Sequence, residues 1–248
     1  MTGFSRRALL AGSGGLLLSG CDRLTTSPTA KSLLSLGEKA SRSAQRLVTG
    51  QALAPEFSAV DISPVFRVNG NTRPTASAYL AHVERGFADW RLAIDGLVAR
   101  PLALSLAHLR ALPQRTQITR HDCVEGWSAI AQWTGVPLAA LLHGAGALPQ
   151  ARYAVFHCAD DFSGTPYYES IDLAEALHPQ TILAHTMNGQ PLSVGHGAPL
   201  RLRVERQLGY KQAKYVMRVE LVASLDRLYG GKGGYWEDHS GYQWWAGI

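Results

Sequence analysis

The sequence predicts an α+β fold with mixed or antiparallel sheets, built around one core. Apolar residues make up 46% of the 248 residues, which is enough to fill a single substantial core. Segments with helical spacing and segments with strand-like alternation follow one another without a regular β-α-β order, so a doubly wound parallel sheet is not expected. The sequence also contains no internal repeat.

Four segments after residue 66 are predicted to be helical. Apolar residues recur at helical spacing in the first, while Ser105 is a suitable cap for the second, which Pro113 ends. Pro137 suits the first turn of the third, and the fourth is a helical turn or two. These helices are expected at residues 79–87, 105–112, 136–142 and 172–177.

Five further segments are predicted to be strands. In the first of them Leu92 and Ile94 alternate with less apolar neighbours, which is the period of a strand that buries one face. The strands are expected at residues 90–98, 117–123, 151–159, 200–204 and 215–222.

The first 20 residues are predicted to be an export signal rather than part of the fold. Arg6 and Arg7 form a twin-arginine pattern, and an apolar run over residues 11–18 follows. Small residues then precede Cys21, as in a bacterial lipoprotein cleavage box. The apolar run is too short for a membrane span, which needs about 20 residues. We therefore expect a Tat-exported periplasmic protein with a possible lipid anchor at Cys21.

Residues 21–60 are predicted to be a tether and N-terminal extension, with a helix in residues 31–53, and residues 61–248 are predicted to form the domain itself. Removal of residues 1–20 takes away Arg6 and Arg7, which lowers the formal net charge from +5 to +3. The remaining basic residues are scattered, so the sequence does not predict a nucleic-acid surface.

The chain contains three cysteines: Cys21, Cys123 and Cys158. Three cysteines are too few for a disulfide framework, although the sequence does not exclude a disulfide bond between Cys123 and Cys158.

Cys123 lies in the most informative segment, Ile118-Thr119-Arg120-His121-Asp122-Cys123-Val124-Glu125-Gly126-Trp127-Ser128. A thiol at a strand end beside Arg120 and His121 is expected to form a thiolate, because nearby positive charge favours that form. The thiolate is the form that binds a metal or attacks an electrophile. A small buried thiol is the alternative interpretation.

The Cys123 segment resembles the metal-anchoring segment of the sulfite oxidase-like molybdopterin oxidoreductases, in which this one cysteine binds molybdenum. The resemblance extends from residue 66 to the C-terminus and includes three other motifs in matching order. These are residues 66–73 (Phe-Arg-Val-Asn-Gly-Asn-Thr-Arg), residues 152–158 (Arg-Tyr-Ala-Val-Phe-His-Cys), and the set 187–192, 196–201 and 209–214.

The resemblance implies a molybdenum–molybdopterin cofactor with Cys123 as its metal ligand. Arg201 and Lys214 would provide cations for the pterin phosphate, and Asn69 and His196 would meet its ring edges. A soft thiolate suits a metal that is also held by dithiolene sulfurs. The full implied cofactor set is Asn69, Thr72, Arg73, Cys123, Cys158, His196, Arg201, Gln212, Ala213 and Lys214. Taken singly, residues such as Arg201 are more often solvated charges.

Two departures concern the cofactor contacts, because Cys158 and His196 stand where a periplasmic methionine sulfoxide reductase of this family has threonine and asparagine. The chain has no room for the C-terminal dimerisation domain of animal and plant relatives and no Cys-x-x-Cys-His haem motif. The resemblance is therefore to the small bacterial branch, which includes the catalytic subunit of that reductase. It implies a monomer with an external electron partner, either a membrane haem protein or a soluble cytochrome.

The activity implied is oxygen-atom transfer to or from a small substrate, by sulfoxide reduction or by sulfite-type oxidation. Arg120 and His121 are candidates to steer a polar substrate, and Glu125 to relay protons. One alternative is a non-catalytic periplasmic binding or assembly lipoprotein that kept the fold. Another is a zinc protein that uses His121, Cys123, His157 and Cys158, although those spacings are tighter than usual zinc sites.

The C-terminal residues 229–248 combine a glycine run with closely spaced tyrosines and tryptophans. No Gly-Lys-Ser/Thr follows the glycines, so a phosphate loop is not predicted. We expect this segment to wrap the surface, with its rings packed into grooves.

Overall fold

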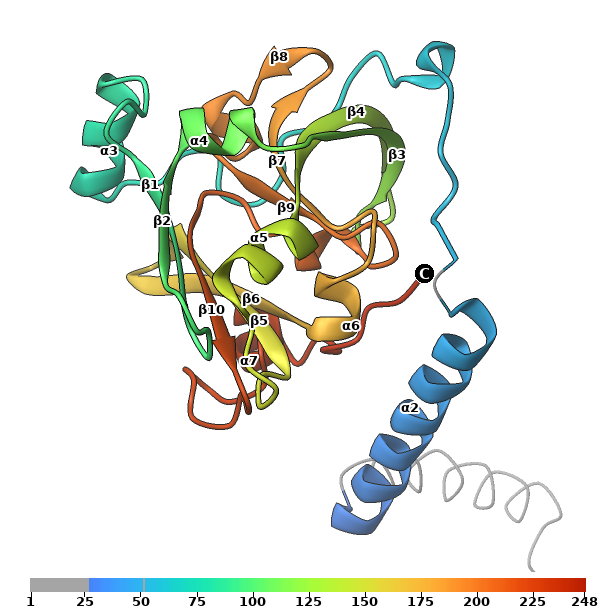
Figure 1. Ribbon diagram of the computed structural model, residues 1–248. Coiled ribbons are helices and arrows are strands. Elements are labelled where there is room, and N and C mark those ends of the chain that lie inside the picture. The colour runs from blue at the N-terminus through green and yellow to red at the C-terminus, as the bar shows by residue number, and fades with distance from the viewer. Residues whose placement is uncertain (1–26, 51) are drawn as a thin grey trace, which may run out of the picture. The chain divides into compact units, whose positions relative to one another are not determined.

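The computed structural model describes residues 27–50 and 52–248 (Figure 1). The predicted export signal and Cys21 lie outside the described residues. The chain divides into two compact units, residues 1–52 and residues 53–248. In the described residues, no helix combines the length and apolar character that a bilayer span requires.

The described part of the first unit is one helix, α2 (Pro28–Thr49). It begins where the Ser27 hydroxyl accepts a hydrogen bond from the Ala30 amide at 3.0 Å, so that a free amide of the first turn is capped. The helix starts three residues before the predicted segment and ends four residues earlier.

The second unit contains two five-stranded sheets. In the first sheet, β1 (Arg91–Gly96) pairs in parallel with β10 (Val216–Val222), while the remaining pairings are antiparallel. The other members are β2 (Leu102–Ser105), β5 (Tyr153–Phe162) and β6 (Thr165–Asp172). The sheet is mixed, as the sequence predicted.

The second sheet is antiparallel and has the order β3-β4-β7-β8, with β9 also paired to β7. Its strands are β3 (Arg115–Asp122), β4 (Ser128–Pro137), β7 (Ile182–Met187), β8 (Gln190–Pro191) and β9 (Arg201–Arg203).

The helices of this unit are short. They are α3 (Ser77–Glu84), α4 (Leu106–Ala111), α5 (Leu138–Ala145), α6 (Leu173–Ala176) and α7 (Tyr235–Ser240), with single 3-10 turns η1 (Ala59–Asp61), η2 (Val194–His196) and η3 (Gly209–Lys211).

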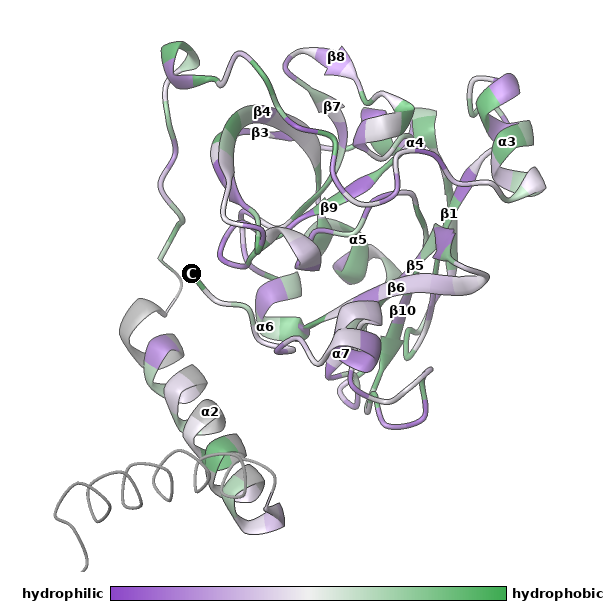
Figure 2. Cartoon of the chain, turned by 180° about the vertical axis from the view of Figure 1, so that it is seen from behind, coloured by the Kyte–Doolittle hydropathy of each residue, from purple (hydrophilic) through white to green (hydrophobic). Residues whose placement is uncertain are grey.

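The main core forms where α5 lies between the two sheets (Figure 1). Leu138, Leu141 and Leu142 of α5 are buried against strands of both sheets, and Figure 2 colours this helix as hydrophobic. Leu92 and Ile94 of β1 are fully buried, in agreement with the predicted alternation. Burial of one such side chain contributes about 1.5–3 kcal/mol.

The predicted helix starts are confirmed at two caps. The Ser105 hydroxyl accepts a hydrogen bond from the His108 amide at 3.0 Å, and the Asp172 carboxylate accepts one from the Glu175 amide at 3.0 Å. At the third helix the boundary differs, because Pro137 still belongs to β4 and α5 begins one residue later. The sequence did not predict β2, β4, β6, β7, β8 or α7.

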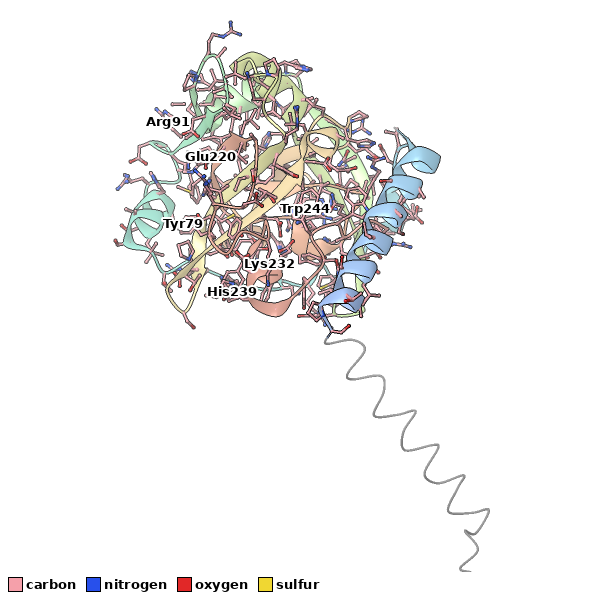
Figure 3. The ribbon with its side chains drawn as sticks, turned by 90° about the horizontal axis from the view of Figure 1, so that it is seen from below. Tyr79, Arg91, Glu220, Lys232, His239 and Trp244 are labelled. Carbon is pink, nitrogen blue, oxygen red and sulfur yellow. The ribbon has the colours of Figure 1, made fainter. Side chains whose placement is uncertain are left out.

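The C-terminal segment packs on the first sheet, as its composition predicted. The Trp244 indole donates a hydrogen bond to the Ser170 hydroxyl of β6 at 2.8 Å and meets the Tyr153 ring edge-on at 5.5 Å. Gly233 has a φ of 94°, and an added Cβ there would meet the Trp244 indole, so a side chain has no room. Figure 3 labels Trp244 and Lys232 of this segment.

Candidate active site

A cavity of about 430 Å³ opens where the end of β3 meets the loop 66–71, the turns η2 and η3, and the C-terminal segment. Eight of the residues predicted for the site line it: Asn69, His121, Cys123, Glu125, His196, Arg201, Gln212 and Lys214. The fold thus gathers residues that are up to 145 positions apart in the chain.

Cys123 lies directly after β3, in the tight connection to β4. Its amide donates to the Trp127 carbonyl at 2.9 Å, and its carbonyl accepts from the Gly126 amide at 3.0 Å. Gly126 has a φ of 85°, a conformation that favours glycine. The turn therefore fixes the backbone of Cys123 while its thiol lines the cavity.

The thiol of Cys123 accepts a hydrogen bond from the Asn69 side-chain amide at 3.3 Å. Burial raises the pKa of Cys123, while Asn69 and Arg67 act in the opposite direction.

The predicted activation of the Cys123 thiol by Arg120 and His121 is wrong. Arg120 is exposed and paired with Asp122 at 2.9 Å, and burial together with Arg203 lowers the pKa of His121 well below its ordinary value. A metal at the sulfur would supply the missing stabilisation of the thiolate.

The alternation of β3 explains why Arg120 and His121 separate. Successive side chains of a strand point to opposite faces, so His121 and Cys123 are buried while Arg120 lies in solvent. Arg203 donates to Nδ1 of His121 at 3.1 Å. Because an arginine always donates, Nδ1 is the acceptor and the neutral ring carries its proton on Nε2. Gly209 lies against that Nε2, where an added Cβ would clash.

Arg201 is a buried cation on the cavity wall, only 4% exposed. One of its terminal nitrogens donates to the His196 carbonyl at 3.2 Å, and its guanidinium stacks on Trp133 at 4.7 Å. Its Nε is buried without a hydrogen-bond partner. Burial, and then the neighbouring Arg203, lower the pKa of Arg201 to about 9. Arg203 differs because it is fully neutralised by Glu205.

Lys214 is the second cation at the cavity. Its ammonium donates to the carbonyls of Asn69 at 2.7 Å, Gly195 at 3.0 Å and Asn71. Burial, and then Arg201, lower the pKa of Lys214 to about 7. Among the described residues neither Lys214 nor Arg201 forms a salt bridge. Two partly desolvated cations without a carboxylate fit an anionic group such as a pterin phosphate.

Asp160 also lines the cavity, although the sequence did not single it out. One carboxylate oxygen accepts from the Asn71 side chain at 2.9 Å, while the other is buried without a partner. Burial raises the pKa of Asp160 to about 6. The carboxylate oxygen without a partner is a suitable acceptor for the N–H donors of a pterin-like heterocycle. Asp160 and the two cations therefore both fit the implied cofactor.

Five predicted residues do not line the cavity: Thr72, Arg73, Arg120, Cys158 and Ala213. Thr72 and Arg73 are exposed on the loop after the cavity wall, and Ala213 is buried in the main core. Cys158 packs against that core as well, and burial raises its pKa well above the ordinary value. The cofactor role predicted for Cys158 therefore has no contact to support it.

The disulfide and zinc alternatives do not agree with this arrangement. Cys123 and Cys158 are both free. His157 is hydrogen-bonded to Glu220 and Tyr229 on the other face of β5 from Cys158. Within the described part of the chain, no group of three or more His, Cys, Asp or Glu side chains could hold a metal ion.

Aromatic residues form a further part of the lining that sequence reasoning missed. They come from β5, β6, η3 and the C-terminal segment: Phe162, Tyr167, Tyr210, Trp236 and Tyr242. The aromatic composition of the tail was visible in the sequence, but nothing there indicated that two of its rings face a cavity.

The fold and the site define the class of protein. The sequence profile of the oxidoreductase molybdopterin binding domain matches residues 80–228, which is more than half of the chain. The chain belongs to this family and is a molybdenum cofactor-dependent oxidoreductase.

The chain is also similar to three proteins that carry a more specific description. The chain is 40% identical to a protein of Azospira oryzae described as "Putative protein-methionine-sulfoxide reductase subunit YedZ1", over 98% of this chain and 88% of that protein. It is 35% identical to the protein-methionine-sulfoxide reductase catalytic subunit MsrP of Xanthomonas campestris, over 55% of this chain and 46% of the relative. Among solved structures it resembles the sulfane dehydrogenase SoxCD of Paracoccus pantotrophus, with a TM-score of 0.50, 26% identity, and 55% and 39% of the two chains covered.

Proposed function

We propose that this protein is an exported enzyme that reduces organic sulfoxides. The observation that carries this proposal is the Cys123 thiol in a cavity whose two cations, Arg201 and Lys214, have no carboxylate partner among the described residues. Both relatives named as sulfoxide reductases are more similar in sequence than the sulfane dehydrogenase, which favours sulfoxide reduction over sulfite-type oxidation.

Different residues of the cavity would bind different parts of the cofactor. Cys123 would hold the metal, and the Asn69 amide at 3.3 Å would orient the sulfur. Arg201 and Lys214 would bind the phosphate, and Asp160 would accept from the heterocycle. When bound, the molybdenum cofactor supplies the couple that exchanges one oxygen atom and two electrons with the substrate.

The reaction needs protons as well as electrons. One sulfoxide, two protons and two electrons give one sulfide and one water, with cleavage of the sulfur–oxygen bond. Glu125 lines the cavity and accepts a hydrogen bond from the Trp127 indole at 3.2 Å, so it can carry protons between solvent and the cavity. His121 lines the cavity, where its ring would help to position a polar substrate.

The electrons would come from a separate one-electron donor, either a membrane haem protein or a soluble cytochrome. We further propose that residues 1–20 direct Tat export and that the predicted tether ends near residue 52, where the second unit begins. The enzyme would work as a periplasmic monomer with Cys21 as a possible lipid attachment point. Mass spectrometry of the exported protein would test this, since an intact twin-arginine segment would contradict export and cleavage.

The activity can be tested with the purified holoenzyme and a reduced viologen dye as artificial donor. We expect dye oxidation on addition of methionine sulfoxide and no oxidation with Cys123→Ala. Sulfite oxidation without sulfoxide reduction would contradict the proposed direction. Full retention of the protein's cellular role in Cys123→Ala would instead favour the non-catalytic binding lipoprotein.

A further inference from the structure

The lining of the cavity changes character from one set of elements to another. Most polar groups come from β3, the loop 66–71 and the residues around β9 and Lys214, with Asp160 on β5 and the rings of Phe66 and Trp127 among them. Five further aromatic residues form what we call the aromatic wall: Phe162, Tyr167, Tyr210, Trp236 and Tyr242. Phe162 meets Trp236 edge-on at 5.0 Å, Trp236 stacks with Tyr242 at 5.9 Å, and Tyr242 meets Tyr210 at 4.9 Å. The wall is thus one continuous aromatic surface.

Two tyrosine hydroxyls of the aromatic wall are occupied by backbone carbonyls. The Tyr167 hydroxyl donates to the Tyr210 carbonyl at 2.9 Å, and the Tyr210 hydroxyl donates to the Gln243 carbonyl at 2.6 Å. Burial raises the pKa of both tyrosines, so they stay neutral. Because their hydroxyls are engaged with the backbone, these residues contribute mainly ring surface to the cavity.

A buried ion cluster holds the wall in place. The Lys211 ammonium, fully buried, pairs with Glu237 at 2.7 Å and with Glu169. Lys211 follows Tyr210 in the chain and Glu237 follows Trp236, so the cluster joins the two segments that carry these rings. The Tyr242 amide also donates to the Trp236 carbonyl at 3.3 Å. The wall is therefore fixed before a ligand arrives, which lowers the entropic cost of binding.

We propose that the aromatic wall is the substrate-selecting subsite and that Trp236 and Tyr242 bind the apolar substituent on the sulfoxide sulfur. This inference rests on the proposed sulfoxide reduction and adds the residues that choose among sulfoxides. Each methylene buried against the rings strengthens binding about fourfold. Inorganic sulfite has no apolar group to bury, and the negative face of an aromatic ring does not attract an anion.

The test compares methyl phenyl sulfoxide with dimethyl sulfoxide in the holoenzyme and in Trp236→Ala and Tyr242→Ala. We expect KM for the phenyl substrate to rise roughly tenfold in each variant, with kcat almost unchanged, while KM for dimethyl sulfoxide changes less than about threefold. Trp236→Phe should restore most of the affinity. Tyr229→Ala is the matched control, because Tyr229 is exposed and stacks on Tyr168 away from the cavity lining.

A second readout does not depend on turnover. Methyl phenyl sulfone keeps the substituents but is not reduced, and its affinity can be measured by calorimetry. We expect a loss of roughly tenfold in Trp236→Ala and no loss in Tyr229→Ala. Equal effects on both sulfoxides, or unchanged sulfone affinity in a variant with normal molybdenum content, would overturn the subsite. Failure of the wild type to reduce any sulfoxide would reject the proposed function alone, and the sulfone titration would still decide the subsite.

Discussion

Replacement of Lys211 by methionine should destabilise the protein strongly. Its ammonium is the cation of a buried cluster in which the side chains of Lys211, Glu169 and Glu237 are at most 1% exposed. Removal of one partner from a buried ion pair costs about 3–5 kcal/mol, because an uncompensated charge stays in the core. For a domain of this size, that loss lowers Tm by roughly 6–20 °C.

The pH dependence of the variant follows from Glu169. Burial, and then the charge of Glu237, raise the pKa of Glu169 well above its ordinary value even with Lys211 present, and removal of Lys211 raises it further. The folded state then holds a proton that the unfolded chain releases, so the free energy of unfolding falls as pH rises above the unfolded pKa. The slope reaches about 1.4 kcal/mol per pH unit for each such carboxyl.

Urea denaturation at pH 5 and pH 8 measures both effects. Lys232→Met is the matched control, because Lys232 lies in the C-terminal segment that carries Glu237 but is itself exposed (Figure 3). Lys211→Met should be much less stable than the control, more so at pH 8, and addition of Glu169→Gln should recover part of the loss. If Lys211→Met and Lys232→Met unfolded at the same urea concentration, the reasoning about the buried cluster would be refuted.

Three further predictions concern the site. Asp160→Asn should remove a pH dependence of the free energy of unfolding. Because burial raises the pKa of Asp160 to about 6, the wild type loses up to about 3 kcal/mol of stability as pH rises from about 4 to 6. Urea titrations of the variant should lack this loss. Gly209→Ala should displace His121 and cost about 1–3 kcal/mol with loss of activity. Gly144→Ala is the control: its Cβ has ordinary space and Gly144 lies in α5, so this variant should be at least as stable as wild type. Cys158→Ala should keep its molybdenum within about twofold, since its thiol lies outside the cavity; loss of the metal would contradict that placement.

The sequence predicted those elements whose local signals agree with their burial. Leu92 and Ile94 alternate as a half-buried strand should, and Ser105 caps a helix through its own hydroxyl. Strand β6 was missed because Glu169 and Ser170 look like surface residues and become core residues only through partners far along the chain. No local pattern reports such pairings.

The residues of the site also separate into those that the sequence predicted and those that it did not. Cys123 was predicted from its own segment, and Arg201 and Lys214 through the resemblance, because each is recognisable from its residue type and neighbours. Asp160 and Trp236 could not be found, since their role depends on a cavity that the sheets and the C-terminal segment close together. The alternation of β3 also places Arg120 outside the cavity lining, although Arg120 is only three residues before Cys123 in the sequence.

The most direct test of the account is the molybdenum content of the natively exported protein, with Cys123→Ala as the comparison. The account predicts about one molybdenum per chain in the wild type, because the thiol, Arg201 and Lys214 together fit one cofactor, and loss of the metal in the variant. A correctly folded, exported wild type without molybdenum, or a Cys123→Ala variant that keeps the metal as firmly, would contradict it.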